Sequence, residues 1–261
     1  MRLKDRVAIV TGAASGIGRA LTPLLGREGT RLGLLDCNDR GLSSLAAELQ
    51  AAGVRCAAAT VDVSDRPAVR AAIDALGGQL GPVDLLVACA GITGTTLVDE
   101  LAVAETERML RVNLLGVAYA IDAVLPGMLA RGSGQIVAVG SLAGCRGMPF
   151  SAAYSASKAA LAAYLESLRP ALRRRGIAVT TALPGFVRTP LMEAARVRPP
   201  LAMMEPERAA AHVLKAIVRR RRVYSFPLRT SLAIRFLRWL PAGVYDWMMS
   251  RAAAKVPDVT Y

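Results

Sequence analysis

The chain alternates short apolar runs with longer segments in which apolar residues recur at helical spacing. A short apolar run that ends at a turn is typical of a buried strand, and the longer period is typical of a helix packed on one face. The apolar runs predict strands over residues 7–10, 31–35, 54–60, 85–88, 135–139, 178–182 and 223–225. The segments between them predict helices up to residue 28, over 39–52, from about 67, and over 97–130, 151–175 and 206–222.

Strands and helices alternate along most of the chain, and no linker, repeat or low-complexity tract interrupts them. This order is typical of an α/β fold in which helices cover both faces of one parallel sheet. A chain of 261 residues is long enough to bury roughly 70–75% of its unfolded surface in one domain. We therefore predict one doubly wound domain over residues 1–228, with about seven parallel strands, and a C-terminal amphipathic helical extension of it over residues 229–261.

The segment 112–125 is almost wholly apolar and raises the question of a membrane span. A span needs ~20 apolar residues, whereas this segment is shorter, contains Asn113 and Asp122 and precedes Pro126. We predict instead a long helix with two buried faces, one packed on the sheet and one on another subunit. Asn113 is then either a core amide satisfied by backbone groups or part of a relay that binds water.

The formal charge of +13 comes almost entirely from arginine. A basic surface is compatible with nucleic acid, anionic lipid or phosphorylated ligands and does not choose among them. The arginine runs at 173–175 and 219–222 fall at predicted helix ends, where cations interact favourably with the helix dipole. Because no recognised binding motif accompanies them, we expect no nucleic-acid partner.

The four cysteines, Cys37, Cys56, Cys89 and Cys145, form no Cys-x-x-Cys pair. We therefore expect reduced core thiols, no metal site and a cytoplasmic protein. The N-terminal residues carry charges before a four-residue apolar run, which predicts neither a signal peptide nor a membrane anchor.

The first predicted strand runs into the sequence TGAASGIG at residues 11–18. Its glycines let the backbone turn tightly and let a phosphate approach the N-terminus of the following helix. Their spacing, Gly-x-x-x-Gly-x-Gly, differs from the usual Gly-x-Gly-x-x-Gly dinucleotide fingerprint. Because the turn follows a strand and precedes a helix, it favours a nucleotide ligand.

Asp36 ends the second predicted strand, about twenty residues after the glycines. An acid in this place suits the hydroxyls of an adenosine ribose. It would repel a 2′-phosphate by several kcal/mol if desolvated, so NAD is expected in preference to NADP. The alternative is that Asp36 caps the helix over residues 39–52.

Tyr154 and Lys158 are four residues apart in a predicted helix and therefore share one face. A tyrosine titrates near pH ~10 and needs a pKa lower by roughly two to three units, or about 3–4 kcal/mol, to act as a base near neutral pH. An ammonium ~4 Å away supplies about 4 kcal/mol at an effective dielectric of ~20. Ser141, on a loop upstream, can hold a substrate oxygen beside the phenol. The alternative is a Tyr-x-x-x-Lys pair on a helix surface.

Six predicted strands end in residues that can contact a ligand. In a doubly wound sheet, ligands bind at the carboxyl ends of the strands. The groups at these ends are the glycine turn, Asp36, Asp62, Gly91, Ser141 and the segment 184–189. Their common location predicts one site and favours a functional Tyr154–Lys158 pair over a surface pair.

These residues together resemble the short-chain dehydrogenase/reductase family over residues 5–226. The resemblance rests on the glycine turn at 11–18, Asp62-Val63, Ala90-Gly91, Asn113, Ser141, Tyr154-x-x-x-Lys158 and Pro184-Gly185. It implies a Rossmann-type fold and an NAD-dependent oxidoreductase that transfers a hydride between the cofactor and an alcohol or ketone.

The resemblance also implies a role for each matching residue. Tyr154 is the acid/base, and Lys158 lowers its pKa and contacts the nicotinamide ribose. Ser141 orients and polarises the substrate oxygen, and Asn113 holds a water that links Lys158 to solvent. The other implied cofactor residues are Gly12, Ser15, Gly16, Ile17, Gly18, Asp36, Asp62, Val63, Ala90, Gly91, Pro184, Gly185, Val187 and Thr189.

The chain departs from the family pattern at residues 88–91, where Ala-Cys-Ala-Gly stands in place of Asn-Asn-Ala-Gly. In the family the two amides help to brace the sheet near the cofactor. Because backbone contacts can survive their loss, we expect lower stability rather than lost chemistry.

The expected substrate-facing positions are mostly apolar: Thr93, Met148, Phe150, Phe186, Leu191 and Met192. They include no obvious clamp for a carboxylate or phosphate, which favours an apolar secondary alcohol or ketone, either steroid-like, terpenoid or acyl. Arg146 and Arg188 remain as an alternative grip on an anionic end.

Residues 229–252 combine apolar and basic positions. On a helical wheel, Arg235 and Arg238 lie opposite a side formed by Leu232, Ala233, Phe236, Leu237, Trp239 and Leu240. A basic amphipathic helix with tryptophan can lie on an anionic membrane, which would make the protein peripheral to a membrane. The commoner role is to cover a pocket or to pack on another subunit.

We also expect a homodimer or homotetramer through the helices over 97–130 and 151–175.

Two other classes of protein are alternatives to an enzyme of this family. A regulator on the same fold would sense NAD(H) without chemistry, but it need not keep Ser141, Tyr154 and Lys158. A serine hydrolase is excluded, because residues 140–144 do not form a Gly-x-Ser-x-Gly elbow.

Overall fold

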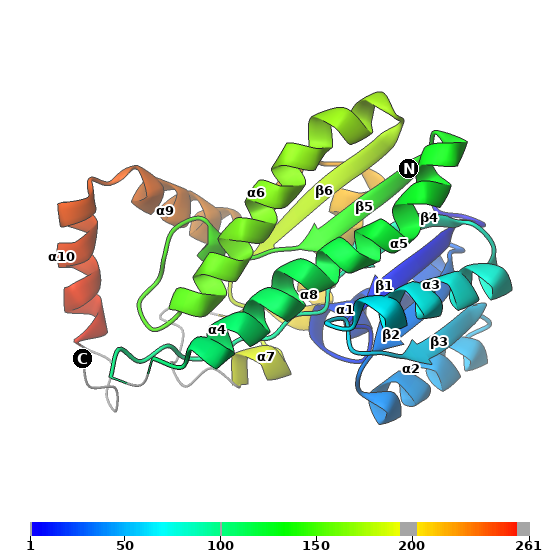
Figure 1. Ribbon diagram of the computed structural model, residues 1–261, viewed down its shortest axis with the longest axis horizontal. Coiled ribbons are helices and arrows are strands. Elements are labelled where there is room, and N and C mark those ends of the chain that lie inside the picture. Colours follow the sequence, from blue (N-terminus) through cyan, green and yellow to red (C-terminus); the bar gives the residue numbers. More distant parts are fainter. Residues whose placement is uncertain (1, 100, 194–202, 255–261) are drawn as a thin grey trace.

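The strands and helices expected from the sequence are present in the computed structural model, which describes residues 2–99, 101–193 and 203–254 (Figure 1). The strands are β1 (Val7–Thr11), β2 (Arg31–Asp36), β3 (Cys56–Thr60), β4 (Val83–Ala88), β5 (Gly134–Val139), β6 (Ile177–Pro184) and β7 (Val223–Phe226). The helices are α1 (Gly16–Arg27), α2 (Asp39–Ala51), α3 (Arg66–Leu80), α4 (Val103–Leu110), α5 (Gly116–Arg131), α6 (Ala152–Arg174), α7 (Pro190–Glu193), α8 (Pro206–Val218), α9 (Leu228–Trp239) and α10 (Ala242–Ala253). A π-helical turn, η1 (Arg111–Leu115), joins α4 to α5, and a 3-10 turn, η2 (Leu142–Gly144), follows β5.

The seven strands form one parallel sheet in the order β3-β2-β1-β4-β5-β6-β7. Strands β1, β2 and β3 follow one another toward one edge of the sheet, and β4, β5, β6 and β7 follow one another toward the other, so the order reverses between β1 and β4. Ligands of such sheets bind where the order reverses, outside the carboxyl ends of the strands. The expected doubly wound Rossmann-type sheet of about seven strands is confirmed.

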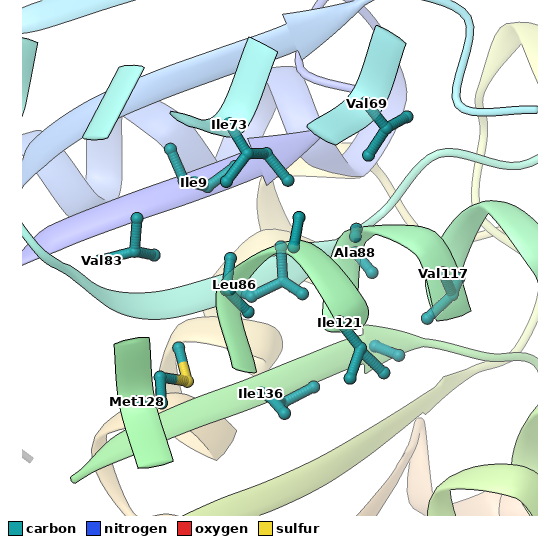
Figure 2. Close-up of a cluster of buried hydrophobic side chains, with 14 of the residues drawn as sticks. Ile9, Val69, Ile73, Val83, Leu86, Ala88, Val117, Ile121, Met128 and Ile136 are labelled. Carbon is teal, nitrogen blue, oxygen red and sulfur yellow. The ribbon is translucent and has the colours of Figure 1, made fainter. Parts of the chain in front are cut away.

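Two apolar layers hold the helices on the sheet, because successive residues of a strand point to opposite faces. On one face α3, α5 and α6 cover the strands, and Figure 2 shows part of this layer, with Ile9, Ile73, Leu86, Ile121 and Ile136. On the other face α1, α2 and α8 pack through Leu21, Leu45 and Val213. Residues such as Ala8 and Val10 of β1 complete this second layer.

The helix from α4 through α5, Val103–Arg131, is long and apolar enough by length and composition to cross a membrane. In this fold its Val117, Ile121 and Met128 are buried in the layer over the sheet. The helix expected over 97–130 begins later, at Val103. The residues before it run over the loop after β5 instead, where the Thr96 N–H donates to the Phe150 carbonyl.

The helix expected over 206–222 ends earlier, at Val218. Arg220 adopts a φ of 45°, and its N–H donates to the Ile217 carbonyl. The Arg221 N–H donates to the Ala216 carbonyl, which completes a Schellman-type cap. The arginine run therefore forms the cap and the connection to β7 rather than the last helical turn.

The C-terminal extension forms α9 and α10, at the end of the molecule farthest from α3 in Figure 1. Its helix α9 turns Ser231 and Ile234 inward, whereas Leu232, Phe236 and Trp239 are exposed. The apolar side expected from the helical wheel therefore faces solvent, and α9 packs on the rest of the fold through its other side. Residues 255–261 of the expected extension lie outside the described residues.

Candidate active site

The carboxyl ends of the strands surround a cavity of about 630 Å³, a volume within the range of small-molecule sites. Residues from the glycine turn, from the ends of several strands and from α4, α6 and α9 line it. Its wall includes nearly all the expected cofactor residues: Gly12, Ser15, Gly16, Ile17, Asp36, Asp62, Val63, Ala90, Gly91, Pro184, Gly185, Val187 and Thr189. Groups far apart in the sequence thus meet at one place.

The glycine turn after β1 is packed too closely for side chains. A Cβ on Gly12 would lie 2.7 Å from the Ala90 backbone, and one on Gly18 would lie 2.1 Å from the Gly12 carbonyl oxygen. Gly16 begins α1 with a φ of 50°, a conformation that favours glycine. The turn brings the N-terminus of α1 to the cavity, where backbone N–H groups can bind a phosphate. Gly18 itself does not line the cavity but lets α1 approach β1.

Asp36 lines the cavity at the end of β2 and also holds the glycine turn. Its Oδ2 accepts a hydrogen bond from the Ala14 N–H at 2.8 Å, and its Oδ1 accepts one from the Asn38 N–H at 2.9 Å. Asp36 is not the cap of α2, because the Asn38 side chain accepts from the Gly41 N–H in that role. The carboxylate is therefore fixed beside the turn.

The departure at residues 88–91 leaves the backbone contacts of the site in place. The Thr11 Oγ1 accepts from the N–H groups of Cys89 and Ala90 at 3.2 and 3.3 Å. Burial raises the pKa of the Cys89 thiol to about 12, so this side chain is a neutral thiol in the cavity wall. The ends of β1 and β4 thus stay joined without the two amides.

Asn113 is fully buried in η1, and the protein satisfies its amide. Its Oδ1 accepts from the Ile92 N–H at 2.9 Å, and its Nδ2 donates to the Ile92 carbonyl and to the Ser157 Oγ, both at 3.0 Å. Both amide hydrogens are engaged within the protein, so the side chain fixes the loop after β4. The part of Asn113 in a relay that binds water stays a prediction.

Ser141, Tyr154 and Lys158 meet in the cavity wall. Ser141 follows β5, and its Oγ accepts from the Ala143 N–H at 3.1 Å at the start of η2. Gly144 lets this loop lie against α6, because a Cβ there would come within 2.7 Å of the Lys158 backbone. One turn of α6 separates the other two residues, and the Lys158 Nζ lies 5.8 Å from the centre of the Tyr154 ring.

Without a bound cofactor, burial is the main influence on the pKa values of Tyr154 and Lys158. It raises the pKa of the Tyr154 phenol, and a hydrogen bond with Ser141 opposes that rise. It lowers the pKa of the Lys158 ammonium to about 8, while the Nζ donates to the Val139 carbonyl at 3.2 Å. The expected lowering of the tyrosine pKa by Lys158 is therefore absent from the chain by itself: desolvation raises this pKa, and Ser141 rather than Lys158 opposes the rise. Tyr154 is a neutral phenol at pH ~7, the form that donates a proton.

All six expected substrate-facing residues line the cavity: Thr93, Met148, Phe150, Phe186, Leu191 and Met192. The anion grip considered for Arg146 is wrong, because this side chain is engaged elsewhere. Its Nη1 donates to three carbonyls at the end of α9, and its guanidinium stacks on the Tyr245 ring at 3.9 Å. Arg188 pairs with Glu205 at 3.0 Å, and both side chains are exposed.

A sequence model of the family described as short chain dehydrogenase matches residues 6–199. The chain belongs to the short-chain dehydrogenase family. Its members are oxidoreductases that use NAD or NADP, and the Rossmann-type sheet described above is their fold.

Three relatives illustrate the range of this family. An uncharacterized oxidoreductase of Myxococcus xanthus is 40% identical over 241 residues, which cover 92% of this chain and 95% of the relative. A 2-dehydro-3-deoxy-L-rhamnonate dehydrogenase (NAD(+)) of a Sphingomonas species is 38% identical over 74% of this chain and 76% of its own. A short-chain dehydrogenase/reductase of Burkholderia phymatum, solved in complex with NAD, superposes with a TM-score of 0.84 at 27% identity over 90% of this chain and 93% of its own.

The residues of this short-chain dehydrogenase fit the dinucleotide cofactor of the family. The glycine turn leaves a cradle that a Cβ on Gly12 or Gly18 would fill, and α1 begins at its edge. An acid, Asp36, lines the cavity at the end of β2. Within residues 2–99, 101–193 and 203–254, no group of three or more His, Cys, Asp and Glu side chains is arranged to hold a metal ion.

The sequence did not reveal every part of the cavity wall. Glu107, Arg108 and Arg111 of α4 and η1 line it, as do Thr230 and Ile234 of α9. No local motif marks the three charged residues, because only the packing of α4 beside the loop after β4 brings them there. The four-residue spacing of Thr230 and Ile234 on an amphipathic helix was a usable signal, but the larger apolar residues on the other side of α9 obscured it.

Proposed function

We propose that this short-chain dehydrogenase interconverts an apolar secondary alcohol and its ketone with NAD as the cofactor. The observation that carries the proposal is the meeting of Ser141, Tyr154 and Lys158 in a cavity whose expected substrate-facing wall is mostly apolar. Phe150, Phe186 and other large apolar side chains of this wall favour a bulky apolar substrate.

Tyr154 is the proposed proton carrier. A bound nicotinamide would accept the hydride of the carbinol carbon during oxidation and return it during reduction. During reduction the Tyr154 phenol gives its proton to the ketone oxygen. During oxidation the hydroxyl proton of the alcohol passes to Tyr154 in its phenolate form, after the phenol has lost its own proton to solvent; the positive charge of an oxidised nicotinamide would favour that phenolate. Ser141, which forms a hydrogen bond with Tyr154, holds the same substrate oxygen and keeps it within reach of the phenol. Orientation of this kind can contribute about 7–11 kcal/mol.

Asp36 and two relatives support NAD over NADP. A 2′-phosphate beside the Asp36 carboxylate would meet a like charge, whereas ribose hydroxyls would meet a hydrogen-bond acceptor. The Sphingomonas relative is named as an NAD(+) enzyme, and the Burkholderia structure contains NAD.

The test is NADH formation from NAD with a panel of apolar secondary alcohols, each assayed with NADP in parallel. We expect turnover with at least one bulky apolar alcohol and a preference for NAD of about tenfold or more in kcat/KM. Turnover with NADP alone would contradict the proposed use of NAD. Turnover with hydroxy acids alone would contradict the proposed class of apolar substrates. If NAD binds in calorimetry but no panel member reacts, the proposed substrate class fails and a regulator that senses NAD(H) becomes the better account.

A further inference from the structure

The helix α9 exposes a line of large apolar side chains on its solvent side. Leu228, Leu232, Phe236 and Trp239 are 71%, 58%, 65% and 86% exposed. Their spacing of four, four and three residues places them next to one another along the helix, and we call them the α9 stripe. Together they expose on the order of 500 Å², an area comparable with the largest apolar patches of soluble monomers, which are often functional.

Arginines border the α9 stripe. At about 100° per residue, Arg229 lies along one edge of the stripe and Arg235 along the other, with Arg238 beyond Arg235. Contrary to the expectation from the sequence, Arg235 thus borders the apolar side and does not lie opposite it. All three side chains are exposed, and α9 contains no acidic residue. The stripe is therefore an apolar line between cationic edges on a chain with a net charge of +13.

We propose that the α9 stripe docks this protein on the surface of an anionic lipid bilayer. Leucine, phenylalanine and tryptophan are the side chains with which interfacial helices enter the region between headgroups and acyl chains. Arginines at the edges of the stripe are placed to bind headgroup phosphates, which carry the complementary charge. Apolar insertion and charge attraction thus act on the same side of one helix.

A second copy of the chain fits the α9 stripe less well than lipid does. In a symmetric pair of stripes, the cationic edges of one copy would face the cationic edges of the other. Like charges across an interface oppose association. The stripe is also smaller than the roughly 800 Å² that each partner contributes to a standard interface.

The inner side of the same helix belongs to the candidate active site. Thr230 and Ile234 line the cavity, and Ser231 is buried beside them. Docking through the outer side would therefore place a wall of the cavity directly on the lipid surface. The docking proposal rests only on the outer side of α9, so it stands or falls separately from the proposed reaction.

Flotation of the full chain with lipid vesicles tests the proposal. We expect the wild type to float with vesicles of phosphatidylcholine mixed with phosphatidylglycerol. With vesicles of phosphatidylcholine alone it should remain in the bottom fraction of the gradient. The double variant Phe236→Ser/Trp239→Ser changes only exposed side chains and should lose flotation. The double variant Arg229→Gln/Arg235→Gln should partition roughly thirtyfold more weakly.

The matched control is Arg219→Gln/Arg222→Gln, which removes the same charge from another exposed arginine run and should keep wild-type flotation. Trp239 also gives a direct readout, because the chain has only two tryptophans. In a Trp247→Phe variant the remaining emission should shift to shorter wavelength when the mixed vesicles are added.

Four results would overturn the proposal. The first two are a wild type that does not float with the mixed vesicles and a Phe236→Ser/Trp239→Ser variant that floats as the wild type does. The other two are an equal loss of flotation in the two double arginine variants and a Trp239 emission that does not shift when the mixed vesicles are added. Light scattering of the protein as it elutes from a size-exclusion column tests whether the α9 stripe binds a second copy of the chain instead. A wild-type oligomer that becomes smaller in the Phe236→Ser/Trp239→Ser variant, without flotation of either protein, would assign the stripe to a second copy.

Discussion

Lys158 links the stability of the fold to pH because its ammonium is buried. Burial lowers its pKa to about 8 in the folded protein, from an ordinary value of 10.5. Below pH 8 the folded and unfolded states both hold the proton, and the desolvated charge weakens the fold. Between about pH 8 and 10.5 the folded state has released the proton while the unfolded state keeps it, so the free energy of unfolding rises with pH.

The variant Lys158→Met removes this titration. Between about pH 8 and 10.5, we expect the free energy of unfolding of the wild type to gain about 3 kcal/mol relative to that of the variant. Urea denaturation of both proteins without cofactor measures the difference, in which the other titrating groups cancel. A difference that stays constant over this range would show that Lys158 is not a buried ammonium.

Single residues show how far sequence reasoning reaches at this scale. The spacing of Tyr154 and Lys158 was enough to predict that they share a face of α6, and the place of Ser141 at the end of a strand was enough to predict a site common to all three. The direction of the tyrosine pKa could not be predicted, because the balance of burial against charge depends on the three-dimensional surroundings of both groups. The hydrogen bond from the Ala14 N–H to Asp36 was equally invisible, since it joins two separate loops.

At the scale of elements, Arg146 joins the loop after β5 to the C-terminal helices. Its guanidinium donates to carbonyls at the end of α9 and stacks on Tyr245 of α10. The Tyr245 hydroxyl in turn donates to the Gly147 carbonyl, next to the cavity-lining Met148. The loop that carries Ser141 is therefore tied to the helices that follow the sheet.

The variant Arg146→Gln breaks this connection. We expect it to lower the free energy of unfolding by about 1–3 kcal/mol, because the carbonyls at the end of α9 lose a charged donor. The KM for the alcohol should rise more than the KM for NAD, since Met148 lines the cavity at a position expected to face the substrate.

Thermal unfolding and steady-state kinetics measure both effects of Arg146→Gln, with Arg188→Gln as the matched control. Arg188 makes an exposed ion pair with Glu205, so its loss should change stability by less than about 1 kcal/mol. Equal effects of the two substitutions would rule out a special role for Arg146.

The elements predicted best were those with a strong apolar pattern. All seven strands were predicted because each is a short apolar run followed by a turn. The end of α8 was misplaced, because its cap uses Arg220 with a positive φ where glycine is the usual signal. The sequence left open which side of α9 faces inward, and the structure turns its largest apolar residues to solvent.

At the scale of the whole molecule, the strand order explains why one site collects residues from the entire chain. Parallel strands have their carboxyl ends on one edge, so the loops after β1, β2, β3, β4, β5 and β6 all reach the cavity. This convergence could be predicted from the sequence, because it follows from the alternation of strands and helices alone. That α4 and α9 line the cavity could not be predicted from the sequence. It depends on how these two helices pack, which the alternation of strands and helices does not determine.

The central claim is that Tyr154 carries the proton in an NAD-dependent oxidoreduction. The most direct measurement is kcat of the Tyr154→Phe variant with an alcohol that the wild type oxidises, together with its affinity for NAD. Phenylalanine keeps the ring and removes only the hydroxyl, so the cavity is retained. We predict unchanged NAD affinity and a kcat lower by about 10²–10⁴-fold. A variant that kept the wild-type kcat would contradict the role assigned to Tyr154.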